Sequence, residues 1–236
     1  MSSTTGDRVD NDDYPTPPWC VERLLERVYL PPGRWLEPCA GRGSIIEAAN
    51  DVYCAAPHMP MLEWTACELQ DKYHDPLRSL DPDVYPRLHI GDFFETFRRW
   101  SFRGDLRLWR EMPFDVAITN PPFELSLAFI QRMRCLAPWV AVLMRVGFLE
   151  GGTSKETQPR ATFLNGDMPD MAILPDRVAF ARSKKSGRWG TDSATYAWAI
   201  WTPERRTEGR IIRLANTPKA VRQQWKRDQD RRMGLE

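Results

Sequence analysis

The segment Asn-Pro-Pro-Phe, from Asn120 to Phe123, brings together residue types that can hold a planar amine. An amine conjugated to a ring is a poor nucleophile, because its lone pair is delocalised. Two acceptors aimed at its N–H groups, Asn120 Oδ1 and a backbone carbonyl fixed by the prolines, can draw that lone pair out of conjugation. Phe123 can stack on the ring, which is worth about 1–3 kcal/mol. The alternative is a plain strand stop, since proline cannot donate to a sheet ladder.

Acidic residues follow three other apolar runs of the chain. Glu37 comes after "RWL", Glu68 ends "LEWTACE", and Asp92 follows "RLHIG". An acid after a second strand can accept both hydroxyls of a ribose, and an acid after a third could bind an exocyclic amine. Phe93, beside Asp92, could stack on a purine. Polar groups at four consecutive strand ends predict one site at the carboxyl edge of a sheet.

The loop "CAGRG" supplies Gly41 and Gly43, which allow a tight turn and close approach of a ligand. Taken alone, the two glycines are better explained by a plain strand-to-helix turn. Ile46 stands where a dinucleotide fingerprint has its third glycine, and there is no GxxxxGK[ST] loop. The pattern therefore favours a nucleoside ligand without a pyrophosphate.

The elements that must position these residues alternate along the chain. Apolar strand candidates are the ranges 34–38, 62–68, 87–92, 114–119, 139–146, 171–180 and 195–201, with helical patterns at 18–28, 44–50 and 125–137. Thr16 can cap the first helix. Alternation of this kind predicts an α/β fold with a mostly parallel seven-stranded sheet, an antiparallel edge hairpin and helices on both faces.

The composition indicates one globular domain. The chain has 236 residues, of which 42% are hydrophobic and 28% charged. We expect a disordered acidic arm at 1–13, a catalytic domain at 14–202 with inserted loops at about 98–112, 148–168 and 182–193, and a basic C-terminal helix or tail at 203–236. Its longest apolar stretch is far shorter than the roughly 20 residues of a membrane span, and no signal peptide is seen. These features predict a cytoplasmic protein that does not bind membranes.

Metal and disulfide chemistry are not expected. The five cysteines are scattered, no CxxC occurs, and the three histidines lie apart from them, so buried free thiols are the simplest interpretation. The net charge of +1 is unevenly spread, because three runs of the chain are basic, at 98–110, 182–188 and 219–232, with aromatic residues among them. Any one run fits a solvated face; together they favour an anionic partner that stacks, such as a nucleic acid.

Four of these motifs, "LEPCAGRG", "CE", "GDFF" and "NPPF", resemble in order and spacing the S-adenosylmethionine-dependent adenine-N6 DNA methyltransferases. The segment "YPTPPWCVERLL" looks like the amino-terminal motif of that family. The resemblance covers about residues 14–201 and implies a Rossmann-like class I methyltransferase fold. It also implies S-adenosylmethionine as cofactor, S-adenosylhomocysteine as product and no metal.

The resemblance implies roles for individual residues. It places Thr16, Pro17, Glu37, Cys39, Gly41 and Gly43 around the methionine part of the cofactor, Glu68 at the ribose hydroxyls, and Asp92 and Phe93 at the cofactor's adenine. Further cofactor contacts are Tyr14, Pro38, Ala40, Leu69 and Asn120. Asn120, Pro121, Pro122 and Phe123 would form the catalytic pocket. Candidate nucleic-acid contacts are Arg182, Lys184, Lys185, Arg188, Trp189 and Tyr196, although Trp198 is an alternative to Tyr196 in the base pocket.

The function implied is methylation of the N6 amine of adenine in DNA, with the base flipped out of the duplex. The chain leaves little room for a separate recognition domain, so we expect short or relaxed sequence specificity. Such an enzyme would suit a phage or mobile element, in a bacterium or infected host cell. Methylation of RNA adenine or of protein glutamine is the alternative, because glutamine also carries a planar conjugated nitrogen. A nucleic-acid-binding module without cofactor is a third interpretation.

Overall fold

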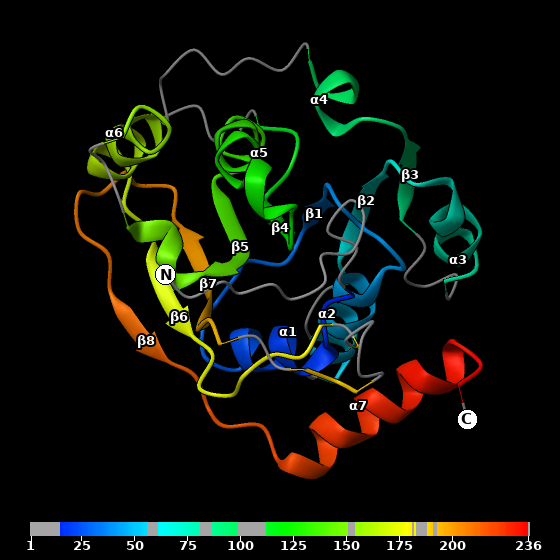
Figure 1. The fold of residues 1–236 in the computed structure, drawn as a ribbon. Helices are drawn as coiled ribbons and strands as arrows, with labels where there is room; N and C mark the ends of the chain where they lie inside the picture. The colour runs from blue at the N-terminus through cyan, green and yellow to red at the C-terminus, as the bar shows by residue number, and fades with distance from the viewer. Residues whose placement is uncertain are drawn as a thin grey trace.

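A computed structural model describes residues 15–55, 61–80, 86–98, 112–150, 154–180, 182, 188–190 and 193–235. Within this part of the chain the strands form one eight-stranded sheet in the order β3-β2-β1-β4-β5-β7-β6-β8. Helices cover both of its faces (Figure 1). The α/β class predicted from the sequence is therefore confirmed.

All strands but one run in the same direction. Their bounds are β1 (Arg34–Glu37), β2 (Glu63–Glu68), β3 (Arg87–Ile90), β4 (Val116–Thr119), β5 (Trp139–Arg145), β6 (Asp170–Ile173), β7 (Tyr196–Trp201) and β8 (Ile211–Arg213). Strand β7 is antiparallel to both β5 and β6, and the other pairs are parallel. The predicted antiparallel pairing near the edge is thus present. The range 203–236, expected only as a basic segment, adds β8 beyond the seven expected strands.

Seven α-helices and three short 3₁₀ helices are found among the described residues. The α-helices are α1 (Pro18–Leu25), α2 (Ser44–Cys54), α3 (His74–Arg78), α4 (Phe93–Thr96), α5 (Ser126–Met133), α6 (Gln158–Gly166) and α7 (Lys219–Arg232). The 3₁₀ helices are η2 (Asp71–Tyr73), η4 (Phe123–Leu125) and η5 (Val146–Leu149). None of these helices is long and apolar enough to cross a membrane.

Two apolar cores lie on opposite faces of the sheet. Helices α1, α2 and α3 pack against one face, in a core that contains Trp35 and Trp198 (Figure 1). Helices α4, α5 and α6 pack against the other face, around Leu36, Val142 and Trp201. Neighbouring residues of one strand, such as Trp35 and Leu36, belong to different cores because side chains alternate along a strand. Burial on both faces explains why the central strands read as continuous apolar runs.

Candidate active site

The carboxyl ends of four neighbouring strands carry the polar residues singled out in the sequence. Glu37 ends β1, Glu68 ends β2 opposite Ile90 of β3, and Asn120 follows β4. Asp92 follows β3 by two residues. Because β3, β2, β1 and β4 are adjacent and parallel, these residues lie along one edge of the sheet. This edge is where open parallel sheets bind ligands.

The glycine loop between β1 and α2 bends over the end of β2. The Ala40 N–H donates to the Cys67 carbonyl at 3.0 Å, and the Gly41 N–H donates to Glu68 Oε2 at 2.7 Å. Gly41 and Gly43 have φ of +53° and +86°, which few side chains tolerate. A Cβ at Gly43 would come within 2.9 Å of Leu80, whereas one at Gly41 would meet nothing within 4 Å. The space beside Gly41 is therefore open to a ligand.

Two buried carboxylates lie beneath this loop. Glu68 is only 5% exposed, and its Oε1 accepts the Gln70 N–H at 2.6 Å while Oε2 accepts from Gly41. Glu37 is 1% exposed, and its Oε2 has no hydrogen-bond partner among the described residues. Burial, and then the negative charge of Glu68, raises the pKa of Glu37 well above its usual value. A buried oxygen without a partner in the protein can be satisfied by a donor from a ligand or from water.

Three further loop residues, Pro38, Cys39 and Ala40, directly follow Glu37. Pro38 and Ala40 are buried, and burial raises the pKa of the Cys39 thiol well above its usual value. A thiol held protonated in this way is a poor nucleophile.

Asn120 is held by the segment that precedes α1. Its Nδ2 donates to Thr16 Oγ1 at 3.2 Å, across 104 positions of sequence. This bond fixes the amide orientation, so that Oδ1 is on the side away from Thr16. The sequence predicts Thr16 as a helix cap, but the structure places Pro17 at that position, and no side chain caps α1. The Thr16 hydroxyl is engaged by Asn120 rather than by the start of α1.

The two prolines after Asn120 have different surroundings. The Pro122 carbonyl accepts from the Leu125 N–H at 3.0 Å and from the Ser126 hydroxyl at 3.4 Å, and so closes the η4 turn. Pro121 is buried, and no described residue donates to its carbonyl. The Pro122 carbonyl therefore forms the turn, whereas the Pro121 carbonyl, directly beside Asn120, does not.

Phe123 forms a cluster with two residues of the neighbouring strands. Arg145 ends β5 and pairs with Tyr196, the first residue of β7. The Arg145 guanidinium carbon lies 5.0 Å from the centre of the Phe123 ring, and Arg145 Nε donates to Tyr196 Oη at 3.1 Å. Sequence reasoning missed Arg145. It could have been found as a charged residue at the end of an apolar strand, on the same edge of the sheet as Asn120.

Asp92 and Phe93 differ in their surroundings. Asp92 is exposed and caps α4 by accepting the Glu95 N–H at 3.0 Å. Phe93 is 3% exposed and stacks on Phe129, with ring centres 5.2 Å apart and planes at 8°. The aromatic ring of Phe93 is therefore part of the core and offers little surface to a ligand. Leu69 and Ile90, which are 62% and 47% exposed, present the apolar surface beside Glu68 instead.

The residues predicted for nucleic-acid binding are divided by the structure. Tyr14, Lys184, Lys185 and almost all of the expected loop 98–112 lie outside the described residues. Arg182 and Trp189 pair as an isolated antiparallel bridge, and both bind Asp230 of α7 at 3.0 Å. Arg188 is exposed. In the expected loop 148–168, residues 158–166 form α6, whose Leu164 is buried in the core.

No cluster of three His, Cys, Asp or Glu side chains in the described part of the chain is arranged to hold a metal ion. No protein-family model matches the chain, and no curated protein matches it in sequence.

Solved structures do resemble the chain, at low sequence identity. The methyltransferase subunit of a type I restriction-modification system from Streptococcus thermophilus has a TM-score of 0.58 and 15% identity, over 95% of this chain and 54% of that one. A modification subunit of a putative type I restriction enzyme from Vibrio vulnificus YJ016 has a TM-score of 0.52 and 16% identity, over 91% and 49%. A putative class I S-adenosylmethionine-dependent methyltransferase from Listeria monocytogenes has a TM-score of 0.51 and 13% identity, over 89% and 67%.

These likenesses show the fold, which is that of the Rossmann-like class I methyltransferases. The chain spans about half the length of the two restriction-modification subunits.

Proposed function

We propose that the protein transfers a methyl group from S-adenosylmethionine to the N6 amine of adenine in DNA. The observation that supports this most is the line of Asp92, Glu68, Glu37 and Asn120 along one sheet edge. Groups suited to a nucleoside lie at the β3–β2–β1 end, and an acceptor corner suited to a planar amine lies next to them after β4. A methyl donor and a methyl acceptor need such adjacent pockets.

The residues present fit the methionine and ribose parts of this cofactor. Glu37 Oε2 has no partner, and an ammonium group beside it would supply the missing donor and neutralise the buried charge. The Glu68 oxygens, already held by two backbone N–H groups, retain lone pairs that could accept the ribose hydroxyls. Gly41 leaves open space for the connecting chain. When bound, S-adenosylmethionine supplies an electrophilic methyl group on sulfur.

The purine of the cofactor would lie beside β3. Leu69 and Ile90 offer exposed apolar surface for its faces, and the exposed Asp92 offers an acceptor for its amine. Phe93 would act through packing, because it anchors α4 in the core and thereby positions Asp92.

The target amine would meet Asn120 and Pro121. Asn120 Oδ1 and the Pro121 carbonyl each accept one of its N–H groups and turn its lone pair toward the cofactor side. The bond to Thr16 fixes the amide before substrate arrives. The Arg145 guanidinium carbon lies over one face of the Phe123 ring, 5.0 Å from its centre, so a base would stack on the opposite face.

The test incubates the protein and labelled S-adenosylmethionine with duplex DNA, RNA or a glutamine-containing protein. Each product is then digested and its methylated component identified by mass. We expect N6-methyladenine from DNA. Label only in RNA adenine or in glutamine would overturn the choice of substrate, and label in none of the three would contradict the proposed reaction.

The variant Asn120→Ala tests whether this residue takes part in methyl transfer. It removes one acceptor, and we expect turnover to fall by about 10²–10³-fold, the usual cost of losing one group that orients charge in a transition state. The control is Asn165→Ala, at an exposed position of α6. Calorimetry should show cofactor binding in both variants. Normal turnover of the Asn120 variant would remove this residue from the catalytic pocket.

A further inference from the structure

Side chains from three elements meet around the ring of Phe123. Phe123 opens the η4 turn, Arg145 ends β5, and Tyr196 begins β7. The Arg145 guanidinium carbon lies 5.0 Å from the centre of the Phe123 ring and 5.9 Å from that of Tyr196, and the centres of the two rings lie 6.0 Å apart. Arg145 therefore lies against both rings, at the same edge of the sheet as Asn120.

Arg145 and Tyr196 are held in place by the sheet. They face each other across the antiparallel β5–β7 pair, and Arg145 Nε donates to Tyr196 Oη at 3.1 Å. The pairing continues one residue further, where the Val146 N–H donates to the Thr195 carbonyl at 2.9 Å. Tyr196 is 3% exposed and packs edge-on against Phe180, with ring centres 5.0 Å apart. The Tyr196 hydroxyl is thus a fixed acceptor for the Arg145 side chain.

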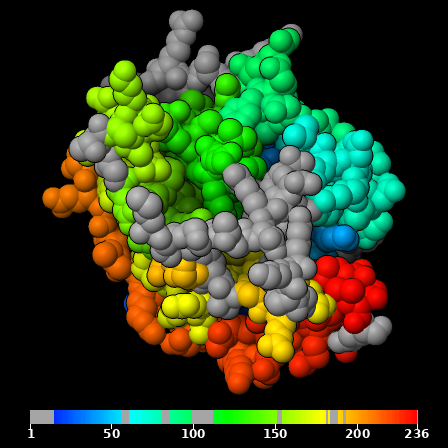
Figure 2. All heavy atoms as spheres, in the orientation of Figure 1, coloured from blue at the N-terminus to red at the C-terminus, as the bar shows by residue number. Residues whose placement is uncertain are grey.

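Phe123 lies on a turn whose own hydrogen bonds are local. The Phe123 carbonyl accepts from the Ser126 hydroxyl at 2.9 Å, and the Pro122 carbonyl accepts from the Leu125 N–H at 3.0 Å. The turn leads directly into α5, which Figure 2 shows in green at the surface between α4 and α6. These bonds shape the turn but do not join it to the sheet. The position of the ring relative to the sheet therefore depends on its side-chain contacts, among them the contact with Arg145.

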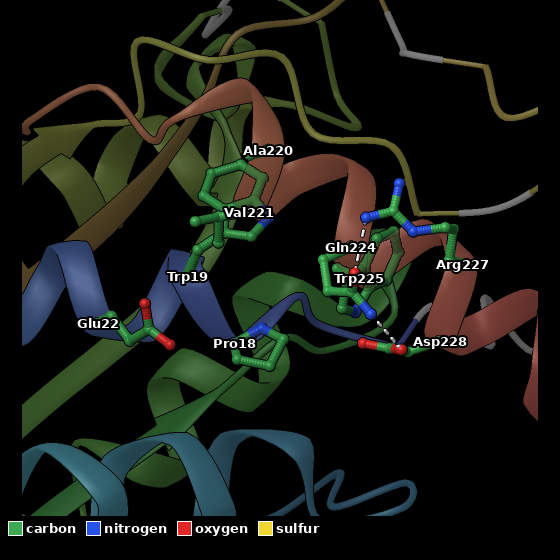
Figure 3. Close-up of a pocket in the computed structure, with 9 residues that line it drawn as sticks. All are labelled: Pro18, Trp19, Glu22, Ala220, Val221, Gln224, Trp225, Arg227 and Asp228. Atoms are coloured by element: carbon green, nitrogen blue, oxygen red, sulfur yellow. Dashed lines mark hydrogen bonds between the residues drawn. The ribbon is translucent and has the colours of Figure 1, made fainter.

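A groove of about 450 Å³ between α1 and α7 is a second place where a flat base could be sought (Figure 3). Trp19 lies on the α1 side of this groove and Trp225 on the α7 side, but these side chains are only 3% and 8% exposed. Their rings therefore offer little surface for stacking. Phe123, in contrast, is partly exposed, so its ring can present a face to a base.

We propose that Arg145 is a positioning residue, which packs on one face of Phe123 and leaves the opposite face to the target base, and that the Tyr196 hydroxyl holds Arg145 in this place. The inference rests on the proposed function, in which Phe123 stacks on the flipped adenine. A guanidinium group is attracted to the negative face of an aromatic ring and is planar, which suits it to stack there. Tyr196 acts through Arg145, because its own ring is buried.

The experiment is a double-variant cycle on the whole protein. Arg145→Met removes the guanidinium, Phe123→Leu removes the ring, and the double variant removes both. Single-turnover methyl transfer to plasmid DNA is measured at saturating S-adenosylmethionine, and calorimetry gives the cofactor affinity.

Two further variants serve as matched controls. Arg87→Met removes an exposed arginine at the start of β3, away from the site. Tyr53→Phe removes a buried hydroxyl that donates to the Leu30 carbonyl, and so matches Tyr196→Phe in burial.

We expect Arg145→Met and Tyr196→Phe each to slow methyl transfer by about two- to thirtyfold, the range that the loss of a contact between a cation and a ring gives. In the Phe123→Leu background, Arg145→Met should change the rate by less than about twofold, because no ring is left to position. Cofactor affinity and both controls should stay at the wild-type values.

Two results would overturn the assignment. An equal effect of Arg145→Met with and without the Phe123 ring, together with a shallower salt dependence of DNA binding, would show that Arg145 contacts a phosphate instead. If Tyr53→Phe slowed methyl transfer as much as Tyr196→Phe, the effect would be one of stability and the role of Tyr196 would be wrong.

A nuclear magnetic resonance signal of the free protein separates this inference from the proposed reaction. The Arg145 Nε–H signal is identified as the one that Arg145→Met lacks. Tyr196→Phe should speed its exchange with solvent, and Phe123→Leu should change its chemical shift. If DNA gains no methyl group but both changes appear, the proposed function fails and the positioning of Arg145 on Phe123 stands. If DNA is methylated but neither variant alters the signal, the reaction stands and the positioning role fails.

Discussion

At the scale of single residues, Glu37 is the residue that most supports the proposed ligand site. A carboxyl group that is 1% exposed and has an unpartnered oxygen destabilises the protein when it ionises. A residue at the end of a strand that served only packing would not need a charge there. Its burial is consistent with an ammonium partner supplied by the proposed cofactor.

This residue predicts a pH dependence with a defined sign. The pKa of Glu37 is raised in the folded protein, so the unfolded chain gives up its proton first as pH rises above about 4.5. The contribution of Glu37 to stability is therefore fully present below that pH and is lost as pH rises toward the folded pKa. Glu37→Gln should stabilise the cofactor-free protein at neutral pH and not in acid, as measured by urea unfolding across pH.

Cofactor binding gives the same prediction an independent readout. An ammonium partner favours the ionised carboxylate, so binding should release a proton from Glu37. Calorimetry at one pH in buffers of different ionisation enthalpy should then give different apparent enthalpies for the wild type and a smaller difference for Glu37→Gln. Identical enthalpies for the wild type in all buffers would show that Glu37 does not face the ammonium group.

At the scale of secondary-structure elements, the central strands were predictable and the periphery was not. Strands β1, β2, β4, β5 and β7 are buried on both faces along almost all of their length, and residues such as Pro121 mark where they stop. Strand β8 has three residues, and its Ile211 is 81% exposed, so no apolar run in the sequence predicts this strand. The docking of α7 depends on Asp230 meeting Arg182, 48 positions away, which no local pattern encodes.

The same contrast applies to the site. Glu68 and Asn120 could be found because a polar residue directly after a buried strand stands out in the sequence. Arg145 could not be assigned, because its role depends on the antiparallel pairing that brings Tyr196 beside it. Phe93 was expected to face a ligand, but α4 turns its side chain into the core. Which side a residue faces after a short loop is decided by packing.

A buried ion pair links the ends of α5 and α6 to residues beside β5 and β7. Arg134, just after α5, binds Asp167, which follows α6, at 3.0 Å, and it donates to the carbonyls of Pro138 and Thr202 at 2.9 Å. Both side chains of the pair are 3% exposed. Burial lowers the pKa of Arg134, and the Asp167 carboxylate opposes that shift.

We therefore expect Arg134→Met to lower the free energy of unfolding by about 3–5 kcal/mol, because it leaves a buried carboxylate without its main partner. The control is Arg78→Met, which removes an exposed pair with Asp75 and should cost no more than about 1 kcal/mol. Urea denaturation measures both. A loss below about 1 kcal/mol for Arg134→Met would mean that the pair does not hold these elements together.

At the scale of the whole molecule, the proposed function assigns two tasks to two halves of the carboxyl edge of the sheet. The proposed cofactor groups follow β1, β2 and β3, whereas Asn120, Phe123 and Arg145 follow β4 and β5. The glycine loop and Glu68 are bonded to each other, and Phe123 contacts Tyr196 and Arg145. Each half therefore has its own internal contacts, so a change in one half should leave the other intact.

Two variants test this separation in opposite directions. Glu68→Gln removes a charged acceptor, whose hydrogen bonds are worth about 1.5–3 kcal/mol, so we expect cofactor affinity to fall by about tenfold to a hundredfold with DNA affinity unchanged. Phe123→Leu removes stacking worth about 1–3 kcal/mol, so we expect methyl transfer at saturating cofactor to fall while cofactor affinity is unchanged. Calorimetry, anisotropy and single-turnover kinetics measure the three quantities. If each variant weakened cofactor and DNA binding together, the two tasks would share one pocket, and the division of the edge between β1 and β4 would be wrong.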